Sequence, residues 1–468
     1  MTFGDIVSGI SGILYNPLLV IILLLGGLYF TFRGKFSQVL MIGDQIKNVT
    51  EKPAEKGGVS SFGALIVSTA SRVGTGNIIG VSTAICLGGF GSVFWMWIIA
   101  IIGSASAFVE STLAQIYKKK GKDGSYGGPA YYIEALCKNR VIPIIFSVML
   151  ILTYGLGFNM LASYNLQSTF SSYPFYDANI TPWIIGGICA VAVGYCLFGG
   201  GSRVIKITSF LVPIMGVAYI AVAIVVICLN AGSLGYVFTR IFTEAFDFQA
   251  IFGGFGGSCV MYGIKRGLFS NEAGVGSAPN ASASAEVSHP AKQGLVQVLS
   301  VFIDTILVCS ATAFMCMCSG VEPTPAIEGA PYVQLSMQAT LGDFGPIFIT
   351  VAMILFAFTT MLGNLYYVDQ AWKYIFKRVP SKKFNYIYYI VASLVIFVGS
   401  GLESKLLWDI ADITMGLMAI INVPVIVILS GYAFKALQDY KDQKEKGKSP
   451  VFRAKDIRLP HDVDYWQE

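Results

Sequence analysis

Long apolar stretches, separated by short polar segments, follow one another along almost the whole chain. A helix needs about 20 apolar residues to cross the hydrocarbon core of a bilayer. Eleven stretches approach or reach this length, with approximate bounds 13–32, 60–86, 92–117, 141–168, 182–199, 206–230, 248–270, 293–319, 346–372, 384–401 and 410–434. The pattern therefore predicts an all-α polytopic membrane protein with eleven transmembrane helices.

Composition narrows the class of protein further. Of the 468 residues, 54% are hydrophobic and only 13% are charged, whereas soluble domains carry roughly 25% charged residues. The 51 glycines lie mostly inside apolar stretches, as is usual in membrane helices. This balance excludes a collagen, a disordered chain, a secreted disulfide scaffold and a nucleic-acid-binding protein. The nine cysteines form no CxxC pair, which favours buried free thiols over a disulfide or metal site.

Basic residues predict the orientation, because positively charged loops stay in the cytoplasm. With eleven crossings, all but three of the 32 Lys and Arg residues fall on one face, Lys265 and Arg266 included. The exceptions are Arg72, inside a span, and Arg240 and Lys405 in outer loops. We therefore expect a multi-pass protein with its N-terminus outside and its C-terminus in the cytoplasm.

Two of the predicted helices are interrupted by glycine. Helices 2 to 11 form two sets of five, and each set opens with such a helix, at Val73–Asn77 and at Phe252–Ser258. Unwound backbone survives in a membrane only where it is buried in protein or lines a cavity, and matched interruptions mark the binding site of transporters. The alternative for each run is a set of glycines that lets helices pack closely.

The matched interruptions predict an inverted repeat, since a set of five crossings returns the chain to the opposite side. The first repeat would hold helices 2–6 and the second helices 7–11. The predicted domains are an N-terminal helix and first cytoplasmic loop (1–57), the two repeats (58–232 and 233–436) and a solvated cytoplasmic tail (437–468).

The break in helix 2 offers two kinds of unpaired backbone group. The N–H groups of Thr75 and Gly76 would hold a substrate carboxylate at the positive end of a half-helix. Carbonyl oxygens at Ala70 and Val73 would face a small cation. One interrupted helix thus predicts a combined site for an amino acid and a cation.

Several strings resemble a known family. Val73–Asn77 is similar to the first core helix of LeuT-type sodium symporters. Gly74–Ile78, Gly88–Gly91 and Phe94–Trp97, with the string Gly263–Gly274 that continues to Pro279, resemble the sodium:alanine (alanine/glycine:cation) symporter family. The resemblance covers helices 1 to 11. It implies the LeuT-type fold of the amino acid–polyamine–cation superfamily, with a 5+5 inverted repeat plus one extra N-terminal helix.

The same resemblance implies that helix 9 completes the cation site. The carbonyl of Phe356 and the hydroxyls of Thr359 and Thr360 share one helical face through their i, i+3, i+4 spacing. With the carbonyls of Ala70 and Val73 they would give Na⁺ five oxygen ligands. The alternative is that the two hydroxyls bond to their own helix backbone. A second sodium site would need the side chains of Asn77 and Ser258.

The remaining substrate contacts are assigned to helices 4, 7 and 9. The ammonium group would meet carbonyls of Phe252 and Gly253, and Phe255 would close over the site. The resemblance points to four residues that line the side-chain pocket, namely Phe252, Gly256, Asn159 and Asn364. Because Gly256 has no side chain and Asn364 offers an amide, the pocket should be roomy and polar. This favours glutamine, with alanine and glycine close behind.

These observations predict a sodium-coupled symporter that imports a small neutral amino acid by alternating access. The sequence has no nucleophile–base pair, phosphate loop or metal cluster, so we do not expect an enzyme. The expected partners are the amino acid, Na⁺ and the lipid bilayer, with neither nucleic acid nor an obligate protein partner. The family resemblance implies the plasma (inner) membrane of a bacterial-type cell.

Two alternatives and three charged residues stay open. A proton-coupled permease on the same fold would titrate Asp304 or Glu110, although hydrogen bonding to helix backbone is the simpler role for both. An amino-acid-sensing receptor would bind without accumulating its ligand. Arg72 could form a cytoplasmic gate or an ion pair, for example with Asp369, or its side chain could extend to the cytoplasmic surface.

Overall fold

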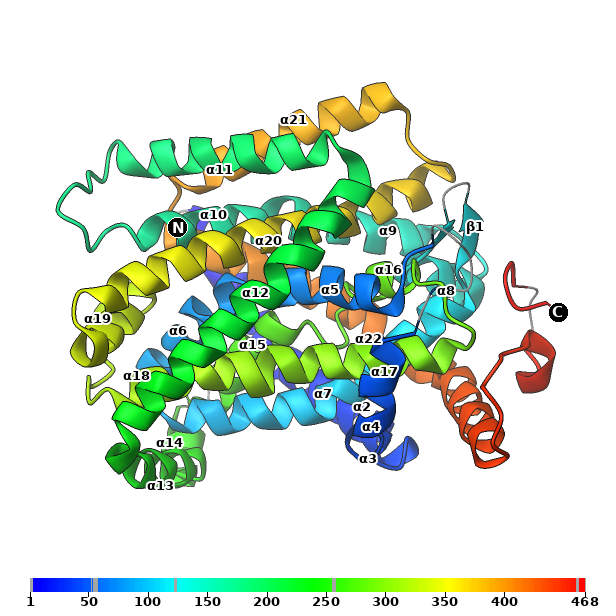
Figure 1. The fold of residues 1–468 in the computed structure, drawn as a ribbon, viewed down its shortest axis with the longest axis horizontal. Coiled ribbons are helices and arrows are strands. Elements are labelled where there is room, and N and C mark those ends of the chain that lie inside the picture. Colours follow the sequence, from blue (N-terminus) through cyan, green and yellow to red (C-terminus); the bar gives the residue numbers. More distant parts are fainter. Residues whose placement is uncertain are drawn as a thin grey trace.

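The chain folds into a bundle of helices that run roughly along one axis (Figure 1). The computed structural model describes residues 3–51, 53, 58–121, 124–254, 258–459 and 463–467. Within these ranges the β-structure is one antiparallel hairpin, β1 (Lys119–Gly121) with β2 (Gly124–Tyr126), and an isolated bridge between Val59 and Ala285. The N-terminus and the C-terminal segment lie at opposite ends of the bundle (Figure 1).

Helical segments cover all eleven of the predicted apolar stretches. The first stretch begins earlier than expected, and the N-terminal elements are α1 (Phe3–Ile13), η1 (Leu14–Leu19), α2 (Val20–Arg33), α3 (Ser37–Leu40) and α4 (Ile42–Val49). The next group is α5 (Ser61–Arg72), η2 (Thr75–Asn77), α6 (Ile79–Gly88), α7 (Gly91–Ile116), α8 (Pro129–Cys137), α9 (Val141–Leu150), η3 (Ile151–Gly157), α10 (Phe158–Ser168), α11 (Thr181–Leu197) and α12 (Gly200–Leu229).

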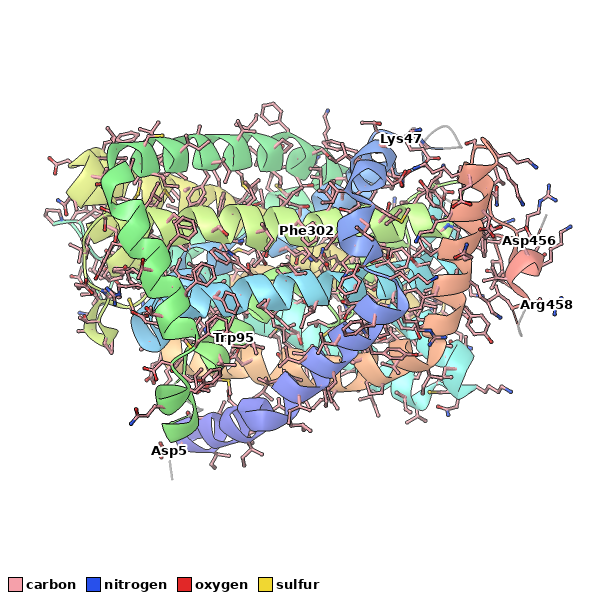
Figure 2. The ribbon with its side chains drawn as sticks, turned by 90° about the horizontal axis from the view of Figure 1, so that it is seen from below. Asp5, Lys47, Trp95, Phe302, Asp456 and Arg458 are labelled. Carbon is pink, nitrogen blue, oxygen red and sulfur yellow. The ribbon has the colours of Figure 1, made fainter. Side chains whose placement is uncertain are left out.

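The second half of the chain contributes longer helices. Its elements are η4 (Ala231–Ser233), α13 (Leu234–Ala245), α14 (Phe248–Gly253), α15 (Cys259–Asn271), α16 (Pro279–Ser282), α17 (Pro290–Val301), η6 (Phe302–Cys309), α18 (Ser310–Cys318), η7 (Pro325–Ile327), α19 (Ala330–Leu341), α20 (Phe344–Phe376), α21 (Lys382–Gly399), α22 (Ser404–Glu445) and η8 (Ala454–Ile457). The segments η3 and η6 are π-helical insertions inside otherwise continuous helices. Figure 2 shows Phe302, the first residue of η6, at the middle of such a helix.

Six helices in the described part of the chain are long and apolar enough to cross a membrane. They are Gly91–Ile116, Val141–Ser168, Gly200–Leu229, Pro290–Cys318, Phe344–Phe376 and Ser404–Glu445. The helix Gly200–Leu229 turns Phe210, Val217 and Leu229 outward as exposed side chains, as expected of a surface that lipid covers. The protein is therefore a multi-pass membrane protein, and the number of eleven crossings stays a prediction.

The C-terminal segment is not the solvated tail that its composition suggests. The helix α22 continues to Glu445, and the chain then folds back onto the end of the bundle. The N–H of Phe452 donates to the carbonyl of Ser288 at 2.9 Å, and the indole N–H of Trp466 donates to the carbonyl of Gln115 at 2.9 Å. Both aromatic side chains are buried. Figure 2 shows η8, with Asp456 and Arg458, beside α22. The prediction of a solvated tail is wrong because apolar residues spaced along it find a partner surface.

Candidate functional site

The predicted interruption of helix 2 is present. Helix α5 ends at Arg72 and α6 begins at Ile79, with only the 3₁₀ turn η2 between them. The side-chain oxygen of Asn77 accepts the N–H of Gly74 at 2.7 Å and so holds the turn. Among the described residues, no acceptor lies within hydrogen-bonding reach of the N–H groups of Thr75 and Gly76. These two groups are free to bind a ligand.

A small enclosed cavity lies against this break. It is lined by residues of four helical segments that are distant in sequence, namely Ser71, Arg72, Gly74, Thr75, Gly76, Phe158, Phe269, Glu272 and Thr360. The free space between them is about 10 Å³, which is room for about one water molecule. The structure thus shows the neighbourhood of the break in a closed form.

Helix α20 brings Thr360, one of the predicted sodium ligands, to the break. A Cβ atom at Gly74 would overlap the hydroxyl of Thr360, and one at Gly363 would lie 2.7 Å from the backbone nitrogen of Ser71. The hydroxyl of Thr360 is buried and has no hydrogen-bond partner in the described part of the chain. An unpartnered buried oxygen is costly, and this hydroxyl is available to bind a cation.

The hydroxyl of Thr359 behaves differently. It donates to the carbonyls of Leu355 at 2.9 Å and Phe356 at 3.2 Å, within its own helix. This is the alternative that the sequence left open for such a pair. The lone pairs of the hydroxyl oxygen still allow it to coordinate a cation. The other two predicted ligands, Ala70 and Val73, are buried at the end of α5.

A second unwound segment lies opposite the break, between α15 and α16. Residue Glu272 has the left-handed conformation (φ +54°), and Gly274 and Gly276 have φ values of +84° and +89°, which glycine adopts without steric cost. The ring of Phe269, near the end of α15, would lie 3.0 Å from a Cβ atom at Gly76. The end of α15 therefore packs against the break at Gly76 and brings the second unwound segment next to it.

The side chain of Glu272 is the charged group that this segment presents to the break. It is almost fully buried. One carboxylate oxygen lies 3.1 Å from the hydroxyl of Ser71 on α5, and the other accepts the hydroxyl of Ser277 at 2.6 Å. A carboxylate is thus held beside the free N–H groups of helix 2.

The predicted second break therefore lies at the wrong place. Phe252 and Gly253 belong to α14, where Gly253 is exposed, and Ser258 caps α15 by accepting the N–H of Met261 at 3.3 Å. The 13 residues of α15 span roughly 20 Å, which places Ser258 at the opposite end of α15 from Phe269, the residue that contacts Gly76 at the break. The prediction that Phe252 and Gly253 accept the ammonium group is wrong.

The proposed pairing of Asn77 with Ser258 in a second sodium site fails for the same reason. The amide of Asn77 instead donates to a carboxylate oxygen of Asp304 at 2.7 Å. The other oxygen of Asp304 accepts the hydroxyls of Ser270 at 2.9 Å and Thr305 at 2.7 Å. Asp304 lies in the π-helical segment η6 and joins the break in helix 2 to the end of α15. The predicted residues Phe255 and Gly256 lie outside the described residues.

The two other charged residues inside the predicted spans are also hydrogen-bonded. Glu110 accepts the amide of Asn422 at 3.0 Å and the N–H of Gly274 at 3.4 Å. The guanidinium of Arg72 is buried and donates to the backbone and side-chain oxygens of Gln297 at 3.4 and 3.3 Å. It neither reaches the surface nor pairs with Asp369, which binds Lys373 at 2.8 Å. Both of these predictions for Arg72 are wrong.

The two predicted amides of the side-chain pocket do lie together. The amide of Asn364 donates to the side-chain oxygen of Asn159 at 2.9 Å and accepts the hydroxyl of Ser71 at 2.7 Å. The side-chain nitrogen of Asn159 is buried without a partner among the described residues. Sequence reasoning missed Asn165, whose amide donates to the hydroxyl of Thr75 at 3.1 Å.

A wider cavity of about 770 Å³ lies beyond Phe269 and Trp408, whose ring centroids are 4.7 Å apart. Lys265, Arg266 and Lys405 all line it. The sequence predicts Lys405 on the outer side and Lys265 and Arg266 in the cytoplasm, and these two assignments are incompatible because all three residues line one cavity. Lys265 and Arg266 belong to the middle of α15, not to a loop.

Two contacts connect basic residues of this wider cavity, which we call the vestibule, to α22. The ammonium of Lys265 lies 2.7 Å from a carboxylate oxygen of Asp412, and the guanidinium of Arg266 lies 3.9 Å from the centroid of the Trp408 ring. Burial raises the pKa of Glu328, which lines the vestibule from a connecting segment. Asp412 and Trp408, on α22, are site residues that the sequence did not reveal.

Comparisons with known proteins agree with this geometry. The model of the sodium:alanine symporter family matches residues 1–454. The probable sodium/glutamine symporter GlnT of Bacillus subtilis is 42% identical over 98% of this chain and 95% of its own length. The sodium/alanine symporter AgcS of Methanococcus maripaludis is 34% identical over 92% of this chain and 96% of its own length.

The amino-acid carrier protein AlsT of Bacillus subtilis is 39% identical over 100% of this chain and 98% of its own length. Among solved structures, MhsT in complex with L-phenylalanine has a TM-score of 0.59 at 16% identity, over 86% of this chain and 96% of that one. That likeness shows the fold. An unwound helix 2 that faces a hydroxyl of α20, together with these matches, shows that the chain belongs to the sodium:alanine symporter family, whose members are sodium-coupled amino-acid transporters rather than enzymes.

Proposed function

We propose that this protein imports glutamine together with Na⁺, and that it also accepts alanine and glycine. The observation that carries the proposal is the unwound segment 73–78, whose free N–H groups lie beside the buried carboxylate of Glu272 and the unpartnered hydroxyl of Thr360. These groups are complementary to the two charges of an amino acid and to a small cation.

The substrate backbone would lie between the two unwound segments. Its carboxylate would accept the N–H groups of Thr75 and Gly76, at the positive end of the half-helix that leads into α6. Its ammonium would pair with Glu272, which replaces the carbonyls that sequence analysis assigned to this task. Because the cavity holds about one water molecule, binding requires Phe158 and Phe269, with ring centroids 4.6 Å apart, to separate.

The sodium ion would bind between α5 and α20. Its ligands would be the carbonyls of Ala70, Val73 and Phe356 and the hydroxyls of Thr359 and Thr360. The unpartnered hydroxyl of Thr360 against Gly74 supports this assignment. A cation at this place would hold the end of α5 in the geometry that presents the free N–H groups.

Glutamine is favoured by the amides of Asn159 and Asn364. Asn364 follows Thr360 by one helical turn and contacts Ser71, which lines the cavity. The buried and unpartnered nitrogen of Asn159 would find an acceptor in the side-chain carbonyl of glutamine. The name of the relative GlnT also supports this substrate.

The direction of transport rests on the proposed orientation. Lys119, Lys138 and Lys377 lie around the same cavity as Asp464, near the C-terminus, and concentrated positive charge is typical of the cytoplasmic end. The vestibule behind Phe269 would then open to the outside. During alternating access the vestibule would first connect to the break in helix 2. The opposite end of the protein would then open and connect the break to the cytoplasm.

Uptake by purified protein in sealed liposomes tests the proposal. We expect labelled glutamine to accumulate when an inward sodium gradient is imposed, and unlabelled alanine and glycine to compete. Accumulation driven by an inward proton gradient without sodium would establish the proton-coupled alternative. Saturable binding without accumulation under either gradient would establish the receptor alternative.

A further inference from the structure

A second polar cavity lies at the end of the molecule that carries the C-terminal segment, far from the break in helix 2. Its volume is about 580 Å³, within the range of small-molecule sites. The end of α7, the β1–β2 hairpin, α8, the end of α20 and the C-terminal segment all contribute to its lining. None of the residues that line this cavity belongs to the proposed amino-acid or sodium site.

Three lysines from separate elements surround this cavity. Lys119 belongs to β1, Lys138 follows α8 and Lys377 follows α20. Lys138 and Lys377 both have the left-handed conformation, with φ values of +54° and +55°, at helix ends where glycine is usually found. Within the described ranges neither of these two ammonium groups forms an ion pair. The lining holds three ammonium groups against the two carboxylates of Glu134 and Asp464, so its net charge is positive.

Tyrosine rings form the walls between the lysines. The ring of Tyr131 contacts those of Tyr126 and Tyr374, with centroids 5.9 and 5.0 Å apart. The fourth tyrosine, Tyr117, is buried, and its hydroxyl has no partner among the residues that the structure describes. Such walls provide flat apolar faces for a planar group and neutral hydroxyl donors for an anion.

One anion already occupies part of the cavity. The carboxylate of Asp464, from the C-terminal segment, lies 2.8 Å from the ammonium of Lys119. The other acidic residue of the lining, Glu134, accepts the hydroxyl of Tyr374 at 2.8 Å. Asp464 is thus paired with a lysine, whereas Glu134 keeps its negative charge beside a neutral hydroxyl, and the Asp464 contact shows that Lys119 can pair with an oxyanion inside the cavity.

We propose that this cavity is a binding site for a phosphate-bearing ligand. Lys138 and Lys377 would contact the phosphate oxygens, the tyrosine rings would pack against a planar or apolar part of the ligand, and Asp464 would compete with the phosphate for Lys119. The phosphate could belong to a soluble nucleotide or to a lipid headgroup, since both present the same anionic group.

Calorimetric titration of the full-length protein with ADP, in detergent without added lipid, tests the nucleotide source. We expect the double variant Lys138→Gln/Lys377→Gln to weaken binding at least tenfold. The matched control Lys382→Gln/Lys383→Gln removes the same charge from the start of α21 and should stay within twofold. Asp464→Asn should strengthen binding severalfold because it removes the competing carboxylate.

The lipid source is tested by native mass spectrometry of the same proteins, released from vesicles of phosphatidylglycerol or of phosphatidylcholine. Retention of phosphatidylglycerol by the parent protein, lost in Lys138→Gln/Lys377→Gln, would assign the site to an anionic headgroup. If neither ADP nor phosphatidylglycerol binds in a way that depends on the two lysines, the proposal is overturned. Size-exclusion profiles and the single variant Lys377→Gln guard against a folding defect.

Discussion

The two glycine-rich interruptions of this chain look alike in sequence but have different surroundings. At the first, a Cβ atom on Gly74 would overlap Thr360, and one on Gly76 would lie 3.0 Å from the ring of Phe269. At the second, Gly253 and Gly254 have nothing within 4 Å of the position of a Cβ atom. Close packing thus leaves no room for a side chain at 74 and little at 76, whereas 253 and 254 have free space.

The segment after α15, which does face helix 2, contains fewer glycines and more polar side chains. Gly274 and Gly276 serve its left-handed turns, while Glu272 and Ser270 present polar side chains to helix 2 and to Asp304. Glycine content therefore indicates where a helix can be interrupted. Neighbouring charges and unpartnered polar groups indicate where a ligand binds. Substitutions in the two regions test this distinction.

The largest effect is expected from Gly74→Val. The new side chain must displace Thr360 and the backbone of the break, and overpacking of this kind costs about 3 kcal/mol or more, equivalent to ~100-fold in binding. Sodium-driven glutamine uptake in liposomes should therefore be lost. The matched variant Gly253→Val should transport within about twofold of the parent protein, since that position has free space. Equal loss in both variants would contradict the distinction.

The next effect concerns the carboxylate of the second unwound segment. Glu272→Gln keeps the shape but removes the charge that would pair with the substrate ammonium, and such pairs are worth about 2–5 kcal/mol. We expect the KM for glutamine to rise about 30-fold or more.

Ser258→Ala is the control for Glu272→Gln, because it removes the helix cap of α15, for a stability loss of about 1 kcal/mol, and leaves the charge of the site unchanged. Its KM should be unchanged, with a slightly lower melting temperature by fluorescence. An unchanged KM in Glu272→Gln would remove this carboxylate from the substrate site.

A smaller effect separates the two threonines of α20. Thr360→Ala removes the unpartnered hydroxyl and should raise the sodium concentration for half-maximal uptake about tenfold, as expected for a contact to a charged group worth ~1.5 kcal/mol. Thr359→Ala should raise it less, because that hydroxyl already bonds to its own helix. Sodium titration of initial rates measures both, and an unchanged value in Thr360→Ala would exclude α20 from the sodium site.

The smallest effect concerns substrate choice. Asn364→Ala should release Asn159, whose side-chain nitrogen would bind the glutamine side chain, and the loss of that bond, worth about 1 kcal/mol, should raise the KM for glutamine about fivefold. The KM for alanine, which has no amide to lose, should stay within twofold. Equal changes for both substrates would show that Asn364 acts only through Ser71, its second hydrogen-bond partner.

Sequence reasoning succeeded where a feature is local. The break at Val73–Asn77 follows from two glycines inside one apolar run, and the structure shows it between α5 and α6. The string Gly263–Pro279 was assigned only as a family signature. A signal for the second unwound segment was present in it, since Glu272, Gly274, Gly276 and Pro279 follow one another directly after an apolar helix.

The sequence by itself determined the apolar helices, the membrane class, the family and the place where helix 2 is interrupted, because these depend on composition and on neighbours along the chain. Only the tertiary structure decided which groups meet at that interruption. Ser71 and Glu272 are 201 residues apart, and Asn77 and Asp304 are 227 apart. Such pairings depend on how helices pack, which no local pattern of residues records.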